Sequence, residues 1–235
     1  MCGRYTETKV NPALVADRFG VRADTIPPET LGRFNVCPTE QVLAVCGERA
    51  RALRWGLVPP WARALGAGPE PINARTESLR AKRLFAPLLE QGERRCLVVA
   101  DGWYEWLRSE RPRGRRVPFR YTVDGGELFA FAGLWHETRL GGERIASVTV
   151  LTTTANPVCA SVHDRMPCVL PSPEAEAAWC SPDVDGEAAL ELLLPLDAGR
   201  TGVAPANPAV NRAGVEGAEL LVVPDEPVQL ELGYG

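Results

Sequence analysis

The chain contains few of the residues from which common metal and catalytic sites are built. Only two of its 235 residues are histidine, and its seven cysteines include no Cys-x-x-Cys pair. The sequence therefore predicts no zinc site and no other bound metal. The G-x-S-x-G, Walker, H-E-x-x-H and G-x-G-x-x-G patterns are also missing, so common hydrolase, nucleotide-binding and zinc-enzyme classes lose support, and no cofactor is expected.

Long apolar runs are missing as well. No run approaches the roughly 18 residues that a membrane-spanning helix needs, and the first twenty residues lack the apolar core of a signal peptide. Most thiols stand among apolar neighbours, as buried cysteines in a reducing compartment do. We therefore expect a cytoplasmic protein that has no membrane partner.

Lysine is nearly absent, and the charge is divided unevenly along the chain. Lys9 and Lys82 are the only lysines among 26 basic residues. Residues 1–122 carry 21 basic and 13 acidic residues, whereas residues 123–235 carry 5 and 17. A GC-rich genome would explain arginine in place of lysine, but it would not explain this division. Because the guanidinium group suits phosphate binding and base stacking, the basic half favours a nucleic-acid partner.

The apolar patterns predict one α+β domain over residues 1–235, with a mostly antiparallel, barrel-like sheet and short helices. Strands are expected at residues 41–46, 52–58, 96–100, 119–123, 128–135, 145–154 and 219–223. Helices are expected at residues 11–19, 76–89, 173–179 and 187–194, with Pro87 breaking the second. The charged segment 108–116 is expected to be a hairpin loop.

Cys2 has the most specific chemistry in the chain. Aminopeptidases remove an initiator methionine when the second residue is small, which would leave Cys2 with a free amine beside its thiol. The reference pKa values of these groups are roughly 7.7–8.0 and 8.5, so both nucleophiles are present near neutral pH. With an aldehyde, the amine forms a Schiff base and the thiol closes a thiazolidine ring. A cysteine at position 2 can also arise by chance.

Three further residues are candidates for catalysis. Asn73 precedes Arg75 by two positions and so shares a face with it in an extended segment, although asparagines before helices are often caps. Glu105 stands among three aromatic residues, where an apolar site would raise its pKa and make it a general acid, unless it points to water. His163 can act as a base at neutral pH, although a His-Asp pair is often only a capped turn.

Six sequence blocks together resemble the SRAP family, the SOS-response-associated peptidase proteins, which are also called abasic-site processing proteins. The blocks follow the family order and span nearly the whole chain. They are Met1-Cys2-Gly3-Arg4-Tyr5, Arg33-Phe34-Asn35-Val36-Cys37-Pro38, Trp55-Gly56-Leu57-Val58-Pro59, Ile72-Asn73-Ala74-Arg75, Ala100-Asp101-Gly102-Trp103-Tyr104-Glu105-Trp106 and Val162-His163-Asp164-Arg165-Met166-Pro167.

The resemblance implies a single domain with a distorted β-barrel core and a positively charged groove for single-stranded DNA that contains abasic sites. It implies that Cys2 forms the thiazolidine link, with Asn73, Glu105 and His163 as the other active-site residues. A monomer is expected. The positions expected to contact DNA are Arg4, Asn35, Pro38, Trp61, Arg75, Arg83, Trp106, Thr152 and Arg165.

Two departures from the family pattern concern this DNA path. Many relatives have a second aromatic residue after the tryptophan, but here Ala62 follows Trp61. Cys37 stands where a small residue usually precedes Pro38 and adds a second thiol near the expected site. The family's peptidase label concerns the removal of residues before the cysteine, and only Met1 precedes it here.

Two other functions use the same residues. One is an N-terminal-nucleophile peptidase or amidase with Cys2, Glu105 and His163, which would act on peptides without DNA. The other is a reader of modified DNA bases that binds reversibly in the groove and tolerates the Cys2→Ala substitution. The basic N-terminal half favours the nucleic-acid partner over the peptide.

We predict that the cellular protein begins at Cys2, because only a free N-terminal amine can form the Schiff base. Intact-protein mass spectrometry should give the mass of residues 2–235. A protein that retains Met1 throughout would contradict the covalent chemistry assigned to Cys2.

Overall fold

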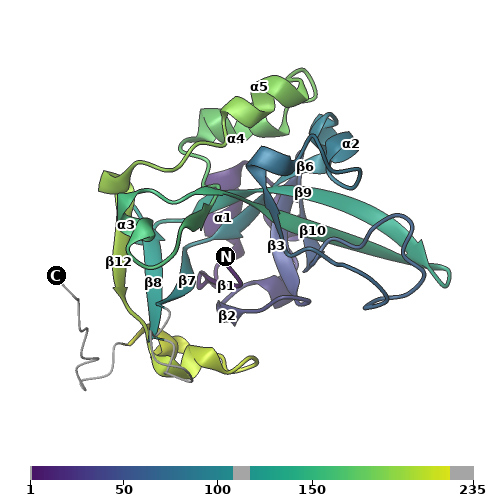
Figure 1. Cartoon of the computed structure of the whole chain (residues 1–235). Coiled ribbons are helices and arrows are strands. Elements are labelled where there is room, and N and C mark those ends of the chain that lie inside the picture. The colour runs from purple at the N-terminus through teal and green to yellow at the C-terminus, as the bar shows by residue number, and fades with distance from the viewer. Residues whose placement is uncertain (1, 108–116, 223–235) are drawn as a thin grey trace.

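A computed structural model describes residues 2–107 and 117–222 (Figure 1). Its strands are β1 (Arg4–Glu7), β2 (Arg33–Val36), β3 (Gln41–Cys46), β4 (Arg49–Trp55), β5 (Asn73–Arg75), β6 (Arg95–Ala100), β7 (Gly102–Leu107), β8 (Val117–Val123), β9 (Phe129–Leu140), β10 (Glu143–Thr154), β11 (Arg165–Pro167) and β12 (Thr201–Pro205). Its α-helices are α1 (Pro12–Phe19), α2 (Ala86–Leu89), α3 (Pro157–Ala160), α4 (Pro173–Cys180) and α5 (Gly186–Glu191). The predicted loop at residues 108–116 lies outside the described residues.

Five strands close into a mixed β-barrel. Around the ring, β10 pairs with β4, β4 with β3, β3 with β6, β6 with β9, and β9 with β10 again. The β10–β4 pairing is parallel and the other four are antiparallel. A second sheet, in the order β12-β8-β7-β1-β2, lies beside the barrel. The expectation of an α+β fold with a mostly antiparallel, distorted barrel is confirmed.

The barrel strands are apolar on both faces because each face covers a different part of the core. On β3, Val42 and Ala44 belong to the cluster that also contains Trp55 and Phe131, whereas Leu43 and Val45 face the other cluster, which packs under the helices. Alternate residues of a strand point to opposite faces, so two buried faces require an unbroken apolar run. This explains why β3 and β6 could be predicted from the sequence.

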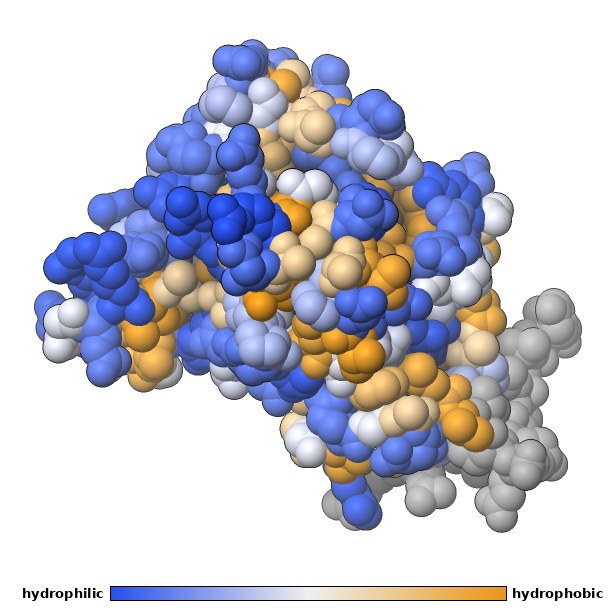
Figure 2. Space-filling view, turned by 180° about the vertical axis from the view of Figure 1, so that it is seen from behind, coloured by the Kyte–Doolittle hydropathy of each residue, from blue (hydrophilic) through white to orange (hydrophobic). Residues whose placement is uncertain are grey.

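The helices cover the outer face of the barrel. Figure 1 shows α4 and α5 over one side of the sheet, and Figure 2 shows the opposite view, in which hydrophobic residues reach the surface between hydrophilic ones. Helix α1 begins and ends as predicted: the Asn11 side chain accepts from the Ala13 N–H at 2.9 Å, and Gly20 follows with a φ of 64°. None of the helices in the described residues is long and apolar enough to span a membrane.

Three predicted elements are wrong in extent or type. Strand β4 covers Arg49–Trp55 rather than residues 52–58, because Gly56 turns the chain with a φ of 131°. Residues 76–89 form a short 3-10 turn and the four-residue α2, in which Pro87 stands in the first turn and starts the helix instead of breaking it. The predicted strand at 219–223 is a 3-10 helix over Ala218–Leu221.

Other boundaries moved, and six strands were not predicted: β1, β2, β5, β7, β11 and β12. Helix α5 covers Gly186–Glu191 and is shorter than the expected 187–194 segment. Strand β12 was missed because three of its five residues, Gly202, Val203 and Ala204, are exposed and leave no apolar pattern. Strand β7 was missed because Gly102 and Glu105 interrupt its aromatic residues, although its first four residues are all buried.

A buried carboxyl group lies on the strand that follows the N-terminus. Glu7, the last residue of β1, is 1% exposed. Burial, and to a lesser extent the negative charge of the nearby Asp101 carboxylate, together raise the pKa of Glu7 to about 8. Asp101 itself is fully occupied, since it accepts from the Thr6 hydroxyl at 2.6 Å and from the Thr8 backbone N–H at 2.9 Å.

We predict that Glu7 makes the protein less stable as the pH rises from about 4.5 to about 8. The folded state keeps the Glu7 proton over this interval, whereas the unfolded chain releases it above its ordinary pKa. The free energy of unfolding should therefore fall by up to about 5 kcal/mol, at about 1.4 kcal/mol per pKa unit. Urea unfolding at several pH values should show a smaller decrease for Glu7→Gln, and an identical decrease in both proteins would contradict this assignment.

Candidate functional site

The N-terminal strand is held on both of its edges. Strand β1 pairs with β2 on one side and with β7 on the other, and Tyr5 lies opposite Val36 and Trp103. The Tyr5 ring packs edge-on against Trp55, with 5.3 Å between ring centroids. These contacts fix the position of Cys2, which is 1% exposed and is separated from the start of β1 by Gly3 alone.

Asn73 contacts Cys2 directly. Its side-chain Nδ2 donates to the Cys2 carbonyl oxygen at 2.6 Å. Asn73 begins β5, which runs parallel to β10 with Asn73 opposite Val150. The preceding carbonyl, that of Ile72, accepts from the Trp55 indole N–H at 2.9 Å, so the barrel core also positions this strand. The structure thus brings together two of the predicted catalytic residues.

The Cys2 thiol is held in its neutral form. Burial raises the pKa of the Cys2 thiol far above its usual value, and the negative charge of Glu105 raises it further. The Cys2 Sγ lies 3.5 Å from the Arg4 carbonyl oxygen, to which a neutral thiol can donate. A thiol in this environment reacts only if a neighbouring group accepts its proton.

Glu105 lies within β7, opposite Phe119 on β8, and is 4% exposed. Burial is the main cause that raises its pKa to about 7, and the Asp164 carboxylate adds to the shift. A carboxyl group with a pKa near neutrality exchanges its proton readily in both directions, as general acid–base catalysis requires. Strand β7 pairs with β1, with Arg4 opposite Tyr104, so Glu105 lies on the strand next to the one that Cys2 precedes.

His163 lies on the loop that carries Asp164, between α3 and β11. The Asn156 side chain caps α3 by accepting from the Cys159 N–H at 2.9 Å, which fixes the start of the loop. The His163 Nδ1 accepts from the Arg165 backbone N–H at 3.0 Å and lies 2.9 Å from an Asp164 carboxylate oxygen. Both contacts hold the ring by Nδ1, which leaves Nε2 as its other nitrogen.

Of the predicted DNA contacts near Cys2, Arg4 is half-buried and Asn35 is 1% exposed. The Arg4 guanidinium donates to the Asn35 side-chain oxygen at 2.8 Å and lies 6.0 Å from the centroid of Trp106. The Asn35 amide donates to two backbone carbonyls beyond β12, at 3.0 Å each. The Trp106 indole N–H donates to Asn211 at 2.6 Å. In this arrangement Asn35 orients Arg4.

Arg165 and Thr152 form a cluster with a residue that sequence analysis missed, Glu77. The Arg165 guanidinium makes two bonds to the Glu77 carboxylate, at 2.5 and 3.0 Å, and a third to the Thr152 carbonyl oxygen at 2.5 Å. Thr152 is fully buried. An anion that binds Arg165 must therefore compete with Glu77. The Glu77 side chain is 53% exposed and can turn towards solvent.

The remaining predicted DNA contacts lie at the surface. Trp61 is 51% exposed, and the Arg83 guanidinium lies 5.2 Å from its ring centroid. Arg75 is exposed at the end of β5, two residues after Asn73. Pro38 is half-buried and precedes Thr39, which has a φ of 75° and donates its N–H to the Trp55 carbonyl at 2.8 Å.

Sequence analysis also missed a second thiol beside the site. Cys159 is buried on α3, and its pKa is raised to about 12, first by burial and then by the Glu105 charge. The Cys37 thiol is buried too and donates to the Asn35 carbonyl at 3.1 Å. No cluster of three or more His, Cys, Asp or Glu side chains within residues 2–107 and 117–222 has the geometry of a metal site.

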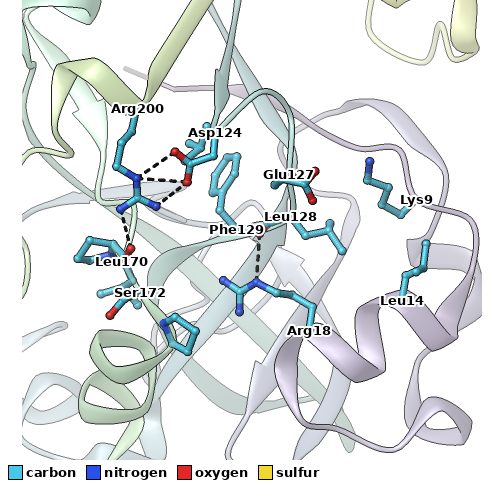
Figure 3. Close-up of a pocket in the computed structure, with 13 residues that line it drawn as sticks. Lys9, Leu14, Arg18, Asp124, Glu127, Leu128, Phe129, Leu170, Ser172 and Arg200 are labelled. Carbon is cyan, nitrogen blue, oxygen red and sulfur yellow. Dashed lines mark hydrogen bonds and ion pairs between the residues drawn. The ribbon is translucent and has the colours of Figure 1, made fainter.

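The cavity in Figure 3 contains none of the predicted site residues. It has a volume of about 440 Å³ and lies between α1, the turn that joins β8 to β9, and the start of α4. Its two arginines are already occupied: Arg200 pairs with Asp124 at 2.6 Å, and Arg18 pairs with Glu176 at 2.7 Å while donating to the Leu128 carbonyl. We assign it no part in the site.

Comparisons with known proteins agree with the motif order. Residues 1–213 match the model of the family described as SOS response associated peptidase (SRAP). The chain is 34% identical to the abasic site processing protein YoaM of Bacillus subtilis, covering 94% of this chain and 97% of YoaM. It is 32% identical to the abasic site processing protein YedK of Escherichia coli, covering 94% and 99%.

Solved structures share the fold. A crystal structure of a Bacteroides thetaiotaomicron protein superposes with a TM-score of 0.76 at 20% identity, covering 88% of this chain and 92% of that one. A protein of Bordetella bronchiseptica gives a TM-score of 0.71 at 26% identity, covering 88% of this chain and all of that one.

We predict that the Glu105 carboxyl group titrates with a midpoint near pH 7, because burial opposes its ionisation. Carbon-13 NMR of the labelled glutamate carboxyl groups should show this midpoint, and the signal should disappear in Glu105→Gln. The Asp164→Asn substitution should lower the midpoint only slightly, since burial is the larger cause. A midpoint near 4 in the unsubstituted protein would contradict the description of Glu105 as a buried acid.

Proposed function

The chain belongs to the SOS response associated peptidase (SRAP) family, and we propose that it processes abasic sites in DNA by bonding covalently to them through Cys2. The names of its relatives, abasic site processing proteins, support the substrate. The observation that carries the proposal is the placement of Cys2. Cys2 is buried and hydrogen-bonded to Asn73, and the strand next to β1 carries Glu105, a carboxyl group whose pKa is near 7.

The proposed reaction needs an unblocked amine on Cys2. That amine attacks the aldehyde carbon of the ring-opened abasic sugar, and loss of one water molecule gives a Schiff base. The Cys2 sulfur then adds to the same carbon while its proton passes to the nitrogen, which closes a thiazolidine ring. An amine, a thiol and an aldehyde thus give one thiazolidine and one water, with no oxidation or reduction.

Glu105 has the properties that the proton transfers need. In its protonated form it can donate to the oxygen that leaves as water, and as a carboxylate it can accept the thiol proton. Asn73 holds the Cys2 carbonyl and so orients the amine and the thiol on the same residue. His163, whose Nδ1 is already used as an acceptor, would act through its Nε2 in forming or reversing the Schiff base.

Single-stranded DNA is the form that fits the exposed residues. Trp61 presents an indole on which an unpaired base can stack, worth about 1–3 kcal/mol. Arg83, Arg75 and Arg4 provide positive charge for phosphates on the way to Cys2. Arg165 would also bind a phosphate once Glu77 turns away, so that a DNA phosphate replaces the Glu77 carboxylate as its partner.

We predict a heat-stable adduct between the mature protein and an oligonucleotide that carries one abasic site, visible on a denaturing gel. Cys2→Ala should abolish it. Cys2→Ser should lower its yield strongly, because a hydroxyl group closes a less stable ring and leaves a hydrolysable Schiff base. An N-terminal tag that blocks the amine should also abolish the adduct, whereas a C-terminal tag, as the matched control, should have no effect.

The same assay separates the two other functions. A peptidase or amidase would cleave peptides without DNA and form no adduct. A reader of modified bases would bind the strand reversibly and retain its affinity in Cys2→Ala. Either result, obtained with protein confirmed by mass to begin at Cys2, would contradict the covalent mechanism.

A further inference from the structure

Two arginines stack on one tryptophan at a part of the barrel that the proposed reaction does not use. The guanidinium carbons of Arg51 and Arg94 lie 5.3 and 5.2 Å from the ring centroid of Trp135. Arg51 comes from β4, Arg94 ends the 3-10 helix Gly92–Arg94, and Trp135 belongs to β9. We call these three residues the arginine–tryptophan cluster.

The tryptophan is a fixed platform. Trp135 is 9% exposed, and its indole N–H donates to the Glu93 backbone carbonyl at 2.8 Å. The ring can therefore neither turn nor leave when the arginines are moved. A guanidinium group held over an aromatic ring keeps its N–H groups available at its edge, where a phosphate or carboxylate binds.

The charge of the cluster is not neutralised by the part of the chain that the structure describes. Neither Arg51 nor Arg94 makes an ion pair there, whereas Arg54, on the same strand as Arg51, pairs with Glu70 at 2.7 Å. Burial lowers the pKa of the nearby His136, and the positive charge of Arg94 lowers it further, against an opposing effect of Glu137, which pairs with Arg144 at 3.2 Å. Two arginines that stack on one ring without an ion-pair partner of their own keep guanidinium N–H groups for an anion.

The cluster lies away from Cys2 but on the same strands. Trp55, on the face of β4 that also carries Arg51, donates to the carbonyl just before Asn73. Strands β4 and β5 both run parallel to β10, with Trp55 opposite Val148 and Asn73 opposite Val150. The Arg51 backbone is thus six strand positions from Asn73, or about 20 Å at ~3.3 Å per residue. Trp135, on the other edge of β10, lies opposite Val148 and is two positions from the level of Asn73.

We propose that the arginine–tryptophan cluster is a second DNA-binding surface, which holds the phosphates of the strand several nucleotides away from the reacting site. This inference rests on the proposed function for its choice of partner, since a protein that bonds to a lesion in a strand also meets the nucleotides beside it. The phosphates of an extended single strand lie farther apart than the ~3.4 Å rise of a double helix, so about 20 Å corresponds to only a few nucleotides.

The test uses non-covalent binding to an undamaged single strand, so its result does not depend on the chemistry at Cys2. With a strand of about 30 nucleotides, the double variant Arg51→Ala/Arg94→Ala should bind several-fold more weakly than the unsubstituted protein. Each lost phosphate contact lowers the slope of log affinity against log salt by about 0.7, so the double variant should lose about 1.4. The matched control is Arg139→Ala, which removes an exposed arginine of β9 that does not stack on Trp135 and should leave the slope unchanged.

A second measurement checks that the double variant is folded and has an intact reaction site. Its adduct yield at a saturating concentration of an abasic oligonucleotide should equal that of the unsubstituted protein, because Cys2 and Asn73 are unchanged and weaker strand binding no longer limits the reaction. Circular dichroism and thermal unfolding provide the same control if no adduct forms with any protein, which would contradict the proposed function alone. An unchanged salt slope in a folded double variant would overturn the inference. So would a loss of polyglutamate binding with strand affinity intact, since the partner would then be an acidic polypeptide.

Discussion

The proposed chemistry depends on keeping a chain terminus in one place. Terminal residues are usually the least ordered part of a domain, because nothing holds them on one side. Here β1 is paired along both edges, and Tyr5 anchors it in the barrel core against Trp55. The Asn73 side chain then holds the Cys2 carbonyl, the last backbone group before the reacting atoms. The barrel thus gives a terminal amine and thiol the fixed geometry that catalytic residues usually have inside a chain.

Burial favours the neutral forms of the ionisable groups around Cys2, whereas the arginines at the surface keep their positive charge. Around Cys2, burial keeps the thiol neutral and raises the pKa of Glu105 to about 7, so near neutral pH this carboxyl group is present in both its protonated and its ionised form. At the surface the arginines differ in how available they are to an anion. Arg165 forms an ion pair with Glu77, whereas Arg83 packs over the Trp61 ring. If the proposed function holds, the reaction at Cys2 would respond mainly to pH and strand binding mainly to salt.

The sequence predicted the barrel strands well because both faces of these strands are buried, which leaves an unbroken apolar run such as that of β3. It failed where one residue type suits two structures: Pro87 starts α2 although proline also breaks helices, and the exposed β12 has no apolar pattern. In the site, Cys2 and Asn73 were predicted and lie in contact. Glu77 could not be predicted as the partner of Arg165, because the two are 88 residues apart and meet only through the pairing of β5 and β11 with β10.

The pairing of β1 with β7 also sets the order of events during synthesis. Tyr5 pairs with Trp103, and at about 5–20 residues per second the ribosome needs roughly 5–20 s to make the chain between them. During that time β1 of the nascent chain cannot yet pair with β7, so the N-terminus stays accessible to aminopeptidases. Once β7 pairs with β1, Cys2 is enclosed. If the cellular protein begins at Cys2, removal of Met1 therefore fits best on the nascent chain, before the barrel closes around Cys2.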